Sequence, residues 1–108
     1  MRRLLPCIIV AAAGCGGGID GDWNIQMTGT CAGQLHIDGP DSQLGGLWAC
    51  GGAAGPVTGS RSGGTVILTL DAAVLRYPLK VNASIDGSSM NGTVAAQNYP
   101  SHVFVGNR

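Results

Sequence analysis

The sequence predicts an all-β domain, a small antiparallel eight-stranded up-and-down barrel, with a β-sandwich as the alternative. Three observations predict this class. Apolar and polar residues alternate in short runs after residue 22, which is the period of a strand with one buried face. Gly, Pro, Asp and Ser separate the runs. The chain has 19 Gly and no Glu, a composition poor in helix-forming residues. A barrel is favoured over a sandwich because closure leaves no strand edge exposed.

The start of the chain has the layout of a secretory signal. Arg2 and Arg3 precede an uncharged, mainly apolar run over residues 4–13. This run is about half of the roughly 20 apolar residues that a membrane-spanning helix needs. A positive head, a short apolar middle and small residues at its end therefore indicate a cleaved signal peptide.

The end of this run, Ala12-Ala13-Gly14-Cys15, resembles the bacterial lipobox, whose cysteine is acylated and becomes the mature N-terminus. Ala12 departs from the Leu that is usual in that motif. The resemblance implies a signal peptide over residues 1–14, a palmitate-type lipid on Cys15 and a Gly-rich tether over 15–21. An ordinary secretory signal with an incidental Cys15 is the alternative.

The lipobox resemblance also implies a place in the cell. It predicts a membrane-anchored lipoprotein of the cell envelope, held through its N-terminal acyl chains. Gly16 stands where enteric inner-membrane lipoproteins carry Asp, which favours the outer membrane. The barrel domain would then occupy residues 22–108.

Charge is sparse in the mature part of the chain. Six Lys and Arg less Arg2 and Arg3 leave four, against six Asp, for a net charge of −2. This balance gives no basic footprint for nucleic acid. We expect a monomer, and the sequence names neither a protein partner nor a ligand.

The alternation predicts about eight strands with loops at 51–55 and 97–101, while residues 71–74 fit either a loop or an irregular turn. Pro78 cannot donate to a β-ladder, so we expect a bulge or a locally unpaired edge there. Residues with an odd number from 75 to 85 should face inward and those with an even number outward. The expected strands cover residues 22–28, 31–37, 44–50, 57–61, 66–70, 75–86, 90–94 and 102–108.

Two hairpins can be given a register. A loop of about four residues centred between Pro40 and Asp41 places Cys31 opposite Cys50, and each inner-face Gly opposite a large residue. This geometry predicts a structural Cys31–Cys50 disulfide, because a metal or redox pair would need CxxC spacing or further ligands. A turn at residues 87–88 places Ile85 opposite Met90 and Val81 opposite Val94.

Gly21-Asp22-Trp23 in the first strand and Arg108 at the end of the last resemble the signature of lipocalin- and avidin-like (calycin) barrels. The resemblance implies that Trp23 plugs one end and that Arg108 lies across its ring in a cation–π contact. This chain is shorter than a typical lipocalin and lacks the usual C-terminal helix.

Four aromatic residues fall on the predicted inner face and form either a ligand pocket or simply the core: Trp23, Trp48, Tyr77 and Phe104. His36 and His102 have no ligand-spaced partner, so we expect solvent exposure. We assign no catalytic residue, metal or cofactor. The leading hypothesis is a non-catalytic binding or interaction module. The alternatives are a periplasmic protease inhibitor, marked by an inserting N-terminal segment, and a carrier of a small apolar ligand.

Overall fold

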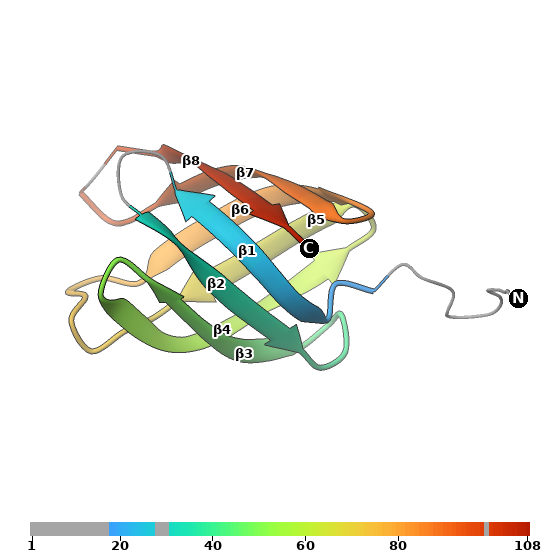
Figure 1. Ribbon diagram of the computed structural model, residues 1–108, viewed down its shortest axis with the longest axis horizontal. Coiled ribbons are helices and arrows are strands. Elements are labelled where there is room, and N and C mark those ends of the chain that lie inside the picture. Colours follow the sequence, from blue (N-terminus) through green and yellow to red (C-terminus); the bar gives the residue numbers. More distant parts are fainter. Residues whose placement is uncertain (1–17, 28–30, 99) are drawn as a thin grey trace, which may run out of the picture.

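The computed structural model describes residues 18–27, 31–98 and 100–108 of the chain. Within them, eight antiparallel strands each pair with the next along the chain, and β8 pairs with β1 to close a barrel (Figure 1). The all-β class and the up-and-down barrel are confirmed. The strands are β1 (Gly21–Met27), β2 (Cys31–Asp38), β3 (Leu44–Cys50), β4 (Ala53–Ser62), β5 (Thr65–Leu70), β6 (Leu79–Asp86), β7 (Ser89–Ala95) and β8 (His102–Asn107).

The predicted signal and Cys15 lie outside the described residues. In the ranges that the structure describes, no helix is long and apolar enough to cross a bilayer.

The core lies inside the barrel and is built from the inward member of each alternating pair. Nineteen hydrophobic residues are buried, from Ile19 to Phe104, and the described residues include no buried polar or charged side chain. Because β1 and β8 pair from Asn24↔Asn107 to Met27↔Phe104, the barrel needs no other chain for closure. Residues 18–108 therefore hold both a closed sheet and its core, and form a self-contained folding unit.

The barrel has two different ends, which lie right and left in Figure 1. The right-hand end holds residues 18–20, the turns at 39–43, 63–64 and 87–88, and the C-terminus. The left-hand end holds the turn at 51–52 and the longer connections at 71–78 and 96–101. The N-terminal segment and these two long connections are thus at opposite ends of the molecule.

The β6–β7 hairpin has the predicted register. Ile85 pairs with Met90 and Val81 with Val94. Gly87 has φ 60° in the first position of the two-residue turn, a conformation that glycine adopts at no steric cost.

The predicted register of the β2–β3 hairpin is wrong by two residues. Gly33, not Cys31, is opposite Cys50, and Leu35 is opposite Trp48. The turn hydrogen bond runs from Gln43 N to Pro40 O (2.9 Å), so the turn is centred one residue later than predicted. A shift of two leaves every side chain on its predicted face, because side chains alternate with a period of two.

Two strand boundaries also differ from the prediction. Residues 75–78 are a loop, and β6 begins at Leu79, directly after the Pro78 that cannot join a ladder. The predicted 51–55 loop shrinks to Gly51-Gly52, whose φ values of 59° and 89° make a tight turn into β4. Residues 53–55 pair with β3, and Gly55 is opposite Trp48.

Three residues of the expected 15–21 tether, 18–20, are in contact with the barrel. Ile19 is 1% exposed and belongs to the core, and the carbonyls of Gly18 and Asp20 accept hydrogen bonds from Arg108. Residues 18–20 therefore pack with the barrel rather than linking it loosely to Cys15.

Candidate binding pocket

One end of the barrel is closed by Trp23 and Arg108. The Trp23 ring is 1% exposed, and its Nε1 donates to Ile19 O at 2.8 Å. The guanidinium carbon of Arg108 lies 4.4 Å from the ring centroid, which is cation–π distance. The same guanidinium donates to Asp20 O (2.9 Å) and Gly87 O (3.3 Å). The placement of this pair is the one that the calycin resemblance implied, and the closed eight-stranded barrel is compatible with that fold.

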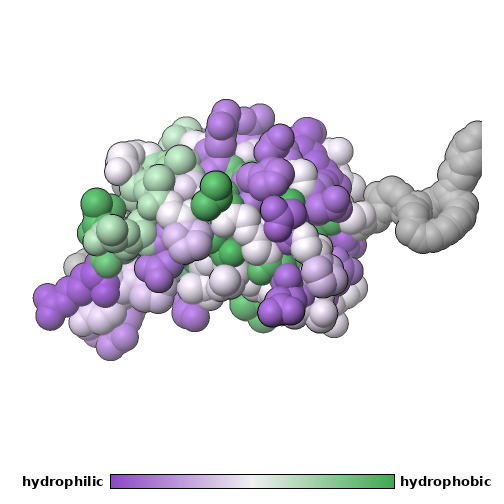
Figure 2. Space-filling view, turned by 90° about the horizontal axis from the view of Figure 1, so that it is seen from below, coloured by the Kyte–Doolittle hydropathy of each residue, from purple (hydrophilic) through white to green (hydrophobic). Residues whose placement is uncertain are grey.

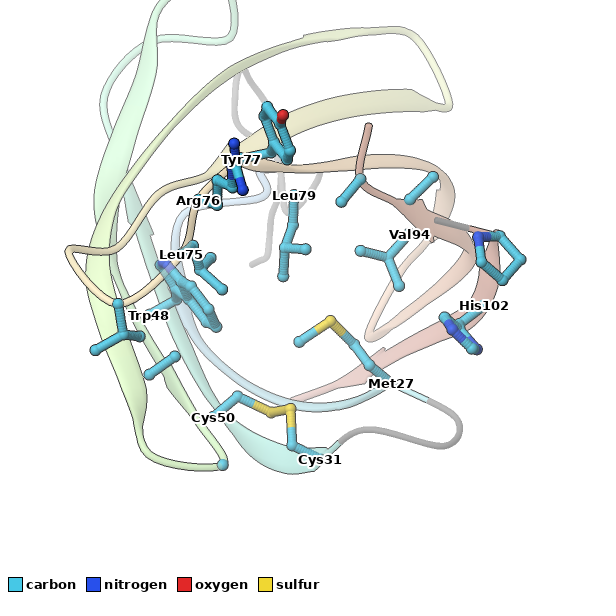
Figure 3. A pocket seen from close by; sticks show the side chains of 16 residues that line it. Met27, Cys31, Trp48, Cys50, Leu75, Arg76, Tyr77, Leu79, Val94 and His102 are labelled. Atoms are coloured by element: carbon cyan, nitrogen blue, oxygen red, sulfur yellow. A yellow bond between two sulfur atoms is a disulfide. The ribbon is translucent and has the colours of Figure 1, made fainter. Parts of the chain in front are cut away.

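The other end opens into a cavity of about 510 Å³ (Figure 3). It lies between the last inward residues of the strands and the connections at 71–78 and 96–101. Most of its wall is apolar, and the larger apolar lining side chains are Met27, Trp48, Leu75, Tyr77, Leu79 and Val94. A barrel of eight strands is just wide enough for its own side chains or one small ligand, and the described side chains leave this end unfilled.

The Cys31–Cys50 disulfide lines one wall of the cavity, at the bottom of Figure 3. The Cα atoms are 5.6 Å apart, although the two residues are not directly opposite in the ladder. Cys50 is 5% exposed and Cys31 is partly exposed. The bond joins β2 to the end of β3, so it holds the wall of the cavity where β3 turns into β4.

The four predicted inner-face aromatics divide between the two regions. Trp23 and Phe104 are 1% and 0% exposed and belong to the core. Trp48 and Tyr77 line the cavity, and Trp48 Nε1 donates to Asp71 O at 2.8 Å. Tyr77 stands on the 71–78 connection rather than on a strand, so its place in the wall does not come from strand alternation.

Two basic side chains are among the described lining residues of the cavity. Arg76, predicted to face outward on a strand, instead lies on the 71–78 connection with its guanidinium carbon 5.7 Å from the centroid of the Tyr77 ring. His102, predicted to be exposed, is half-buried at the start of β8. Sequence alternation missed Arg76 because it extended a strand through Pro78. The proline itself was the signal that the strand begins later.

His36 lies on the outer face near the closed end, away from this cavity. Its Nδ1 is 2.7 Å from Oδ1 of Asp22, its cross-strand partner, and its Nε2 is 3.5 Å from Oδ2 of Asp38. The hydrogen bond to Asp22 raises the pKa of His36 above its ordinary 6.5. Desolvation opposes this rise, and the charges of both aspartates add to it. His36 is therefore a surface ion-pair residue rather than an unpaired one.

A second hollow of about 560 Å³ lies on the outer surface of β1–β4. Its wall consists mainly of outward-facing side chains, including Asn24, Gln34 and the 65% exposed Leu47. It is similar in volume to the cavity at the barrel mouth, but it lies outside the barrel wall. We take the cavity inside the barrel as the candidate site, because its wall is more apolar and the strands surround it.

The described residues contain no group of three or more His, Cys, Asp or Glu side chains arranged to hold a metal ion. The described lining of the cavity includes no Asp, Glu, Ser or Thr. What this arrangement can do chemically is enclose an apolar group and present a guanidinium and an imidazole beside it.

Comparison with family models, with curated proteins and with solved structures finds no match to this chain. A function must therefore be argued from the chain's own residues and geometry.

Proposed function

We propose that this protein is a lipid-anchored, non-catalytic binding module of a bacterial cell envelope, whose cavity holds a small apolar ligand. The observation that carries this proposal is the unfilled mouth of the barrel. The cavity of about 510 Å³ lies within the range of roughly 300–1,000 Å³ typical of small-molecule sites. Its apolar wall suits an apolar ligand, since burial of such a group away from water is favourable.

The closed end supports a ligand site with a single opening. Trp23 and Arg108 seal the end beside the N-terminal segment. The long connections at 71–78 and 96–101 surround the other end, where Val74 is 72% exposed. Figure 2 shows apolar side chains among hydrophilic ones at that end, on the left of the view. A ligand would therefore pass through the left-hand end alone.

Two observations support the lipid anchor: the lipobox-like sequence that ends at Cys15, and the position of Gly18 at the closed end of the barrel. Only Gly16 and Gly17 separate Cys15 from Gly18, which Arg108 holds at the closed end. An acylated Cys15 would lie within about 11 Å of Gly18, from the reach of an extended chain. Acyl chains in the outer membrane would then place the closed end near the bilayer and the mouth away from it.

A non-catalytic role is supported by the chemistry of the lining. The described lining residues include no carboxylate and no Ser or Thr beside His102, and the phenol of Tyr77 is the one hydroxyl among them. Nucleophilic or general acid–base catalysis needs such groups within hydrogen-bond reach of each other.

The protease-inhibitor alternative has less support. Its mark would be an extended N-terminal segment that inserts into a protease cleft. Residues 18–20 are instead held against the barrel, with Ile19 buried and two carbonyls bound by Arg108.

The binding half can be tested with N-phenyl-1-naphthylamine, a neutral apolar dye that fluoresces on burial. We expect one saturable site on residues 16–108 secreted into an oxidising compartment. Ala53 faces the cavity and Ala54, its neighbour, faces outward. Ala53→Phe should therefore weaken dye binding at least fivefold, and Ala54→Phe should not.

Ala96→Phe, from the opposite side of the cavity, provides a second blocking variant if Ala53→Phe does not fold. Unsaturable binding, or equal binding by both blocking variants and the Ala54→Phe control, would exclude a ligand site in the barrel.

The anchoring half has its own test in the bacterial host. Radiolabelled palmitate should label the full-length protein, and Cys15→Ser should abolish both the label and recovery with the membrane fraction. A Cys15→Ser protein that is still labelled would contradict the lipid assignment.

A further inference from the structure

We propose that the ligand of this cavity is an amphipathic anion, with an apolar body inside the barrel and an acidic head at Arg76. This inference rests on the proposed ligand-binding function and adds a charge preference to it. It depends on the charge of the lining, on the unused hydrogen-bond donors of Arg76 and on its position at the mouth.

The charge of the cavity has one sign. Arg76 and His102 are its two basic lining residues, and no Asp or Glu is among the described lining residues. Asp71, at the start of the same connection as Arg76, is not among the lining residues, and its Oδ1 accepts a hydrogen bond from Ala72 N at 2.9 Å. The cavity thus presents positive charge without an internal counter-ion.

Arg76 differs from the other cationic side chains of the barrel. Arg108 donates to three carbonyls, Arg61 Nε donates to Gly63 O at 2.8 Å, and Lys80 Nζ lies 3.2 Å from Thr69 Oγ1. Arg76 lies against the Tyr77 ring, but in the described part of the chain its guanidinium has neither a hydrogen-bond acceptor nor an acidic partner. No described residue accepts from any of its five N–H donors, so these donors can serve another molecule.

The position of Arg76 suits the head of a ligand rather than its body. Arg76 is exposed, whereas the neighbouring lining residues Leu75, Tyr77 and Leu79 are half-buried (Figure 3). Stacking on Tyr77 restricts the guanidinium without using its N–H groups. A planar guanidinium binds carboxylate, sulfonate or phosphate oxygens through two parallel hydrogen bonds. An apolar chain in the cavity would therefore leave its acidic group beside Arg76.

A matched pair of dyes tests the charge preference separately from the cavity. 1-Anilinonaphthalene-8-sulfonate is N-phenyl-1-naphthylamine with one added sulfonate, so the two dyes share an apolar body. In residues 16–108, Arg76→Gln should weaken binding of the sulfonate dye about threefold to fivefold, since an exposed ion pair contributes up to about 1 kcal/mol. Binding of the neutral dye should change less than twofold.

Three further measurements complete the test. Arg76→Lys should retain part of the preference, because it keeps the charge but loses the paired donors. Lys80→Gln removes a cation outside the cavity and should leave the affinity for both dyes unchanged. Raising the salt concentration should weaken binding of the sulfonate dye but not of the neutral dye, since salt screens exposed charges.

The outcomes distinguish failure of the anion preference from failure of the proposed ligand-binding function. If the neutral dye binds in the cavity and Arg76→Gln leaves the ratio of the two affinities unchanged, the anion preference is overturned and the apolar site stands. If the neutral dye does not bind in the cavity at all, the proposed function and the inference both fail.

Discussion

The guanidinium of Arg108 lies over the ring of Trp23, 4.4 Å from its centroid, and so joins the last residue of the chain to the first strand. Through hydrogen bonds to the carbonyls of Gly18, Asp20 and Gly87, the same side chain also holds the N-terminal segment and the β6–β7 turn. One residue therefore connects three separate parts of the closed end. Among the described residues at the mouth, no side chain plays an equivalent part, and none accepts a hydrogen bond from Arg76.

Arg108→Ala should destabilise the barrel by roughly 1–3 kcal/mol. It removes a cation–π contact worth about 0.5–2 kcal/mol and hydrogen bonds that are partly replaced by water. Arg108→Lys should lose less, because it keeps the charge. The measurement is the free energy of unfolding of residues 16–108 in urea, with Lys80→Gln as a control that removes a cation elsewhere. An Arg108→Ala protein as stable as this control would contradict the role assigned to the contact.

Gly92→Ala should be among the more costly single-methyl additions in the barrel. A Cβ at Gly92 would overlap Asn82 O and Ala83 Cα of the neighbouring strand, so the ladder would have to shift. Overpacking of this kind typically costs 1–3 kcal/mol, and we expect about 2 kcal/mol here. Gly64→Ala is the matched control, since its Cβ would meet only Ile85 O at 3.9 Å. Equal urea midpoints for the two variants would show that β7 can move to accept the methyl group.

His36 gives the stability a pH dependence of known sign. Its pKa is raised above 6.5 in the folded protein, chiefly by the hydrogen bond to Asp22. A raised pKa means that the folded state holds the proton more tightly than the unfolded state. The stabilisation is therefore complete below pH about 6.5 and is lost as pH rises through the folded pKa.

Two measurements check this sign. In an NMR titration, Asp22→Asn should lower the pKa of His36 more than Asp38→Asn does, because Asp22 makes the shorter contact, 2.7 Å against 3.5 Å. Between pH 6 and 8 the unfolding free energy should fall further in the native protein than in His36→Gln. Added salt should reduce this difference between the two proteins, because the His36–Asp22 pair is exposed. A His36→Gln protein with the same pH profile would show that the pair adds nothing to stability.

Most of the fold could be predicted because alternation is a local property of the sequence. The β6–β7 register was predicted correctly because a two-residue turn allows only one pairing. The β2–β3 register was not, because the Gly39–Gln43 segment can place its turn in two ways, and only packing across the barrel selects between them. Both registers share the same inward face, so the core residues were predictable where their partners were not.

The site was less predictable than the barrel. Alternation placed Trp48 on the inner face, as the structure has it, but it extended a strand through residues 75–78. Tyr77 and Arg76 instead reach the cavity from an irregular connection, whose path depends on packing against the finished barrel. Sequence periodicity carries no information about such a path. The volume at the mouth likewise depends on many segments together, since its described lining comes from seven strands and from the connections between them.

The orientation of the barrel on a membrane is the last prediction. If Cys15 is acylated, the closed end should lie near the bilayer and the mouth away from it. Ser42 lies in an exposed turn at the closed end, and Val74 is 72% exposed at the mouth. β1 alone, seven residues long, spans about 23 Å between the two ends. A fluorophore on Ser42→Cys should therefore be quenched more strongly than one on Val74→Cys when a quencher is attached to lipid headgroups.

The lipidated full-length protein in zwitterionic vesicles is the sample for this measurement, and residues 16–108 without acyl chains are the control. The control should show no quenching at either position, because the anchor rather than the barrel surface provides the attachment. Stronger quenching at Val74 than at Ser42 would mean that the mouth meets the bilayer, and that the ligand enters from lipid rather than from water. Quenching at Val74 in the unanchored control would also mean that the mouth meets the bilayer. It would show in addition that this contact does not need an acylated Cys15.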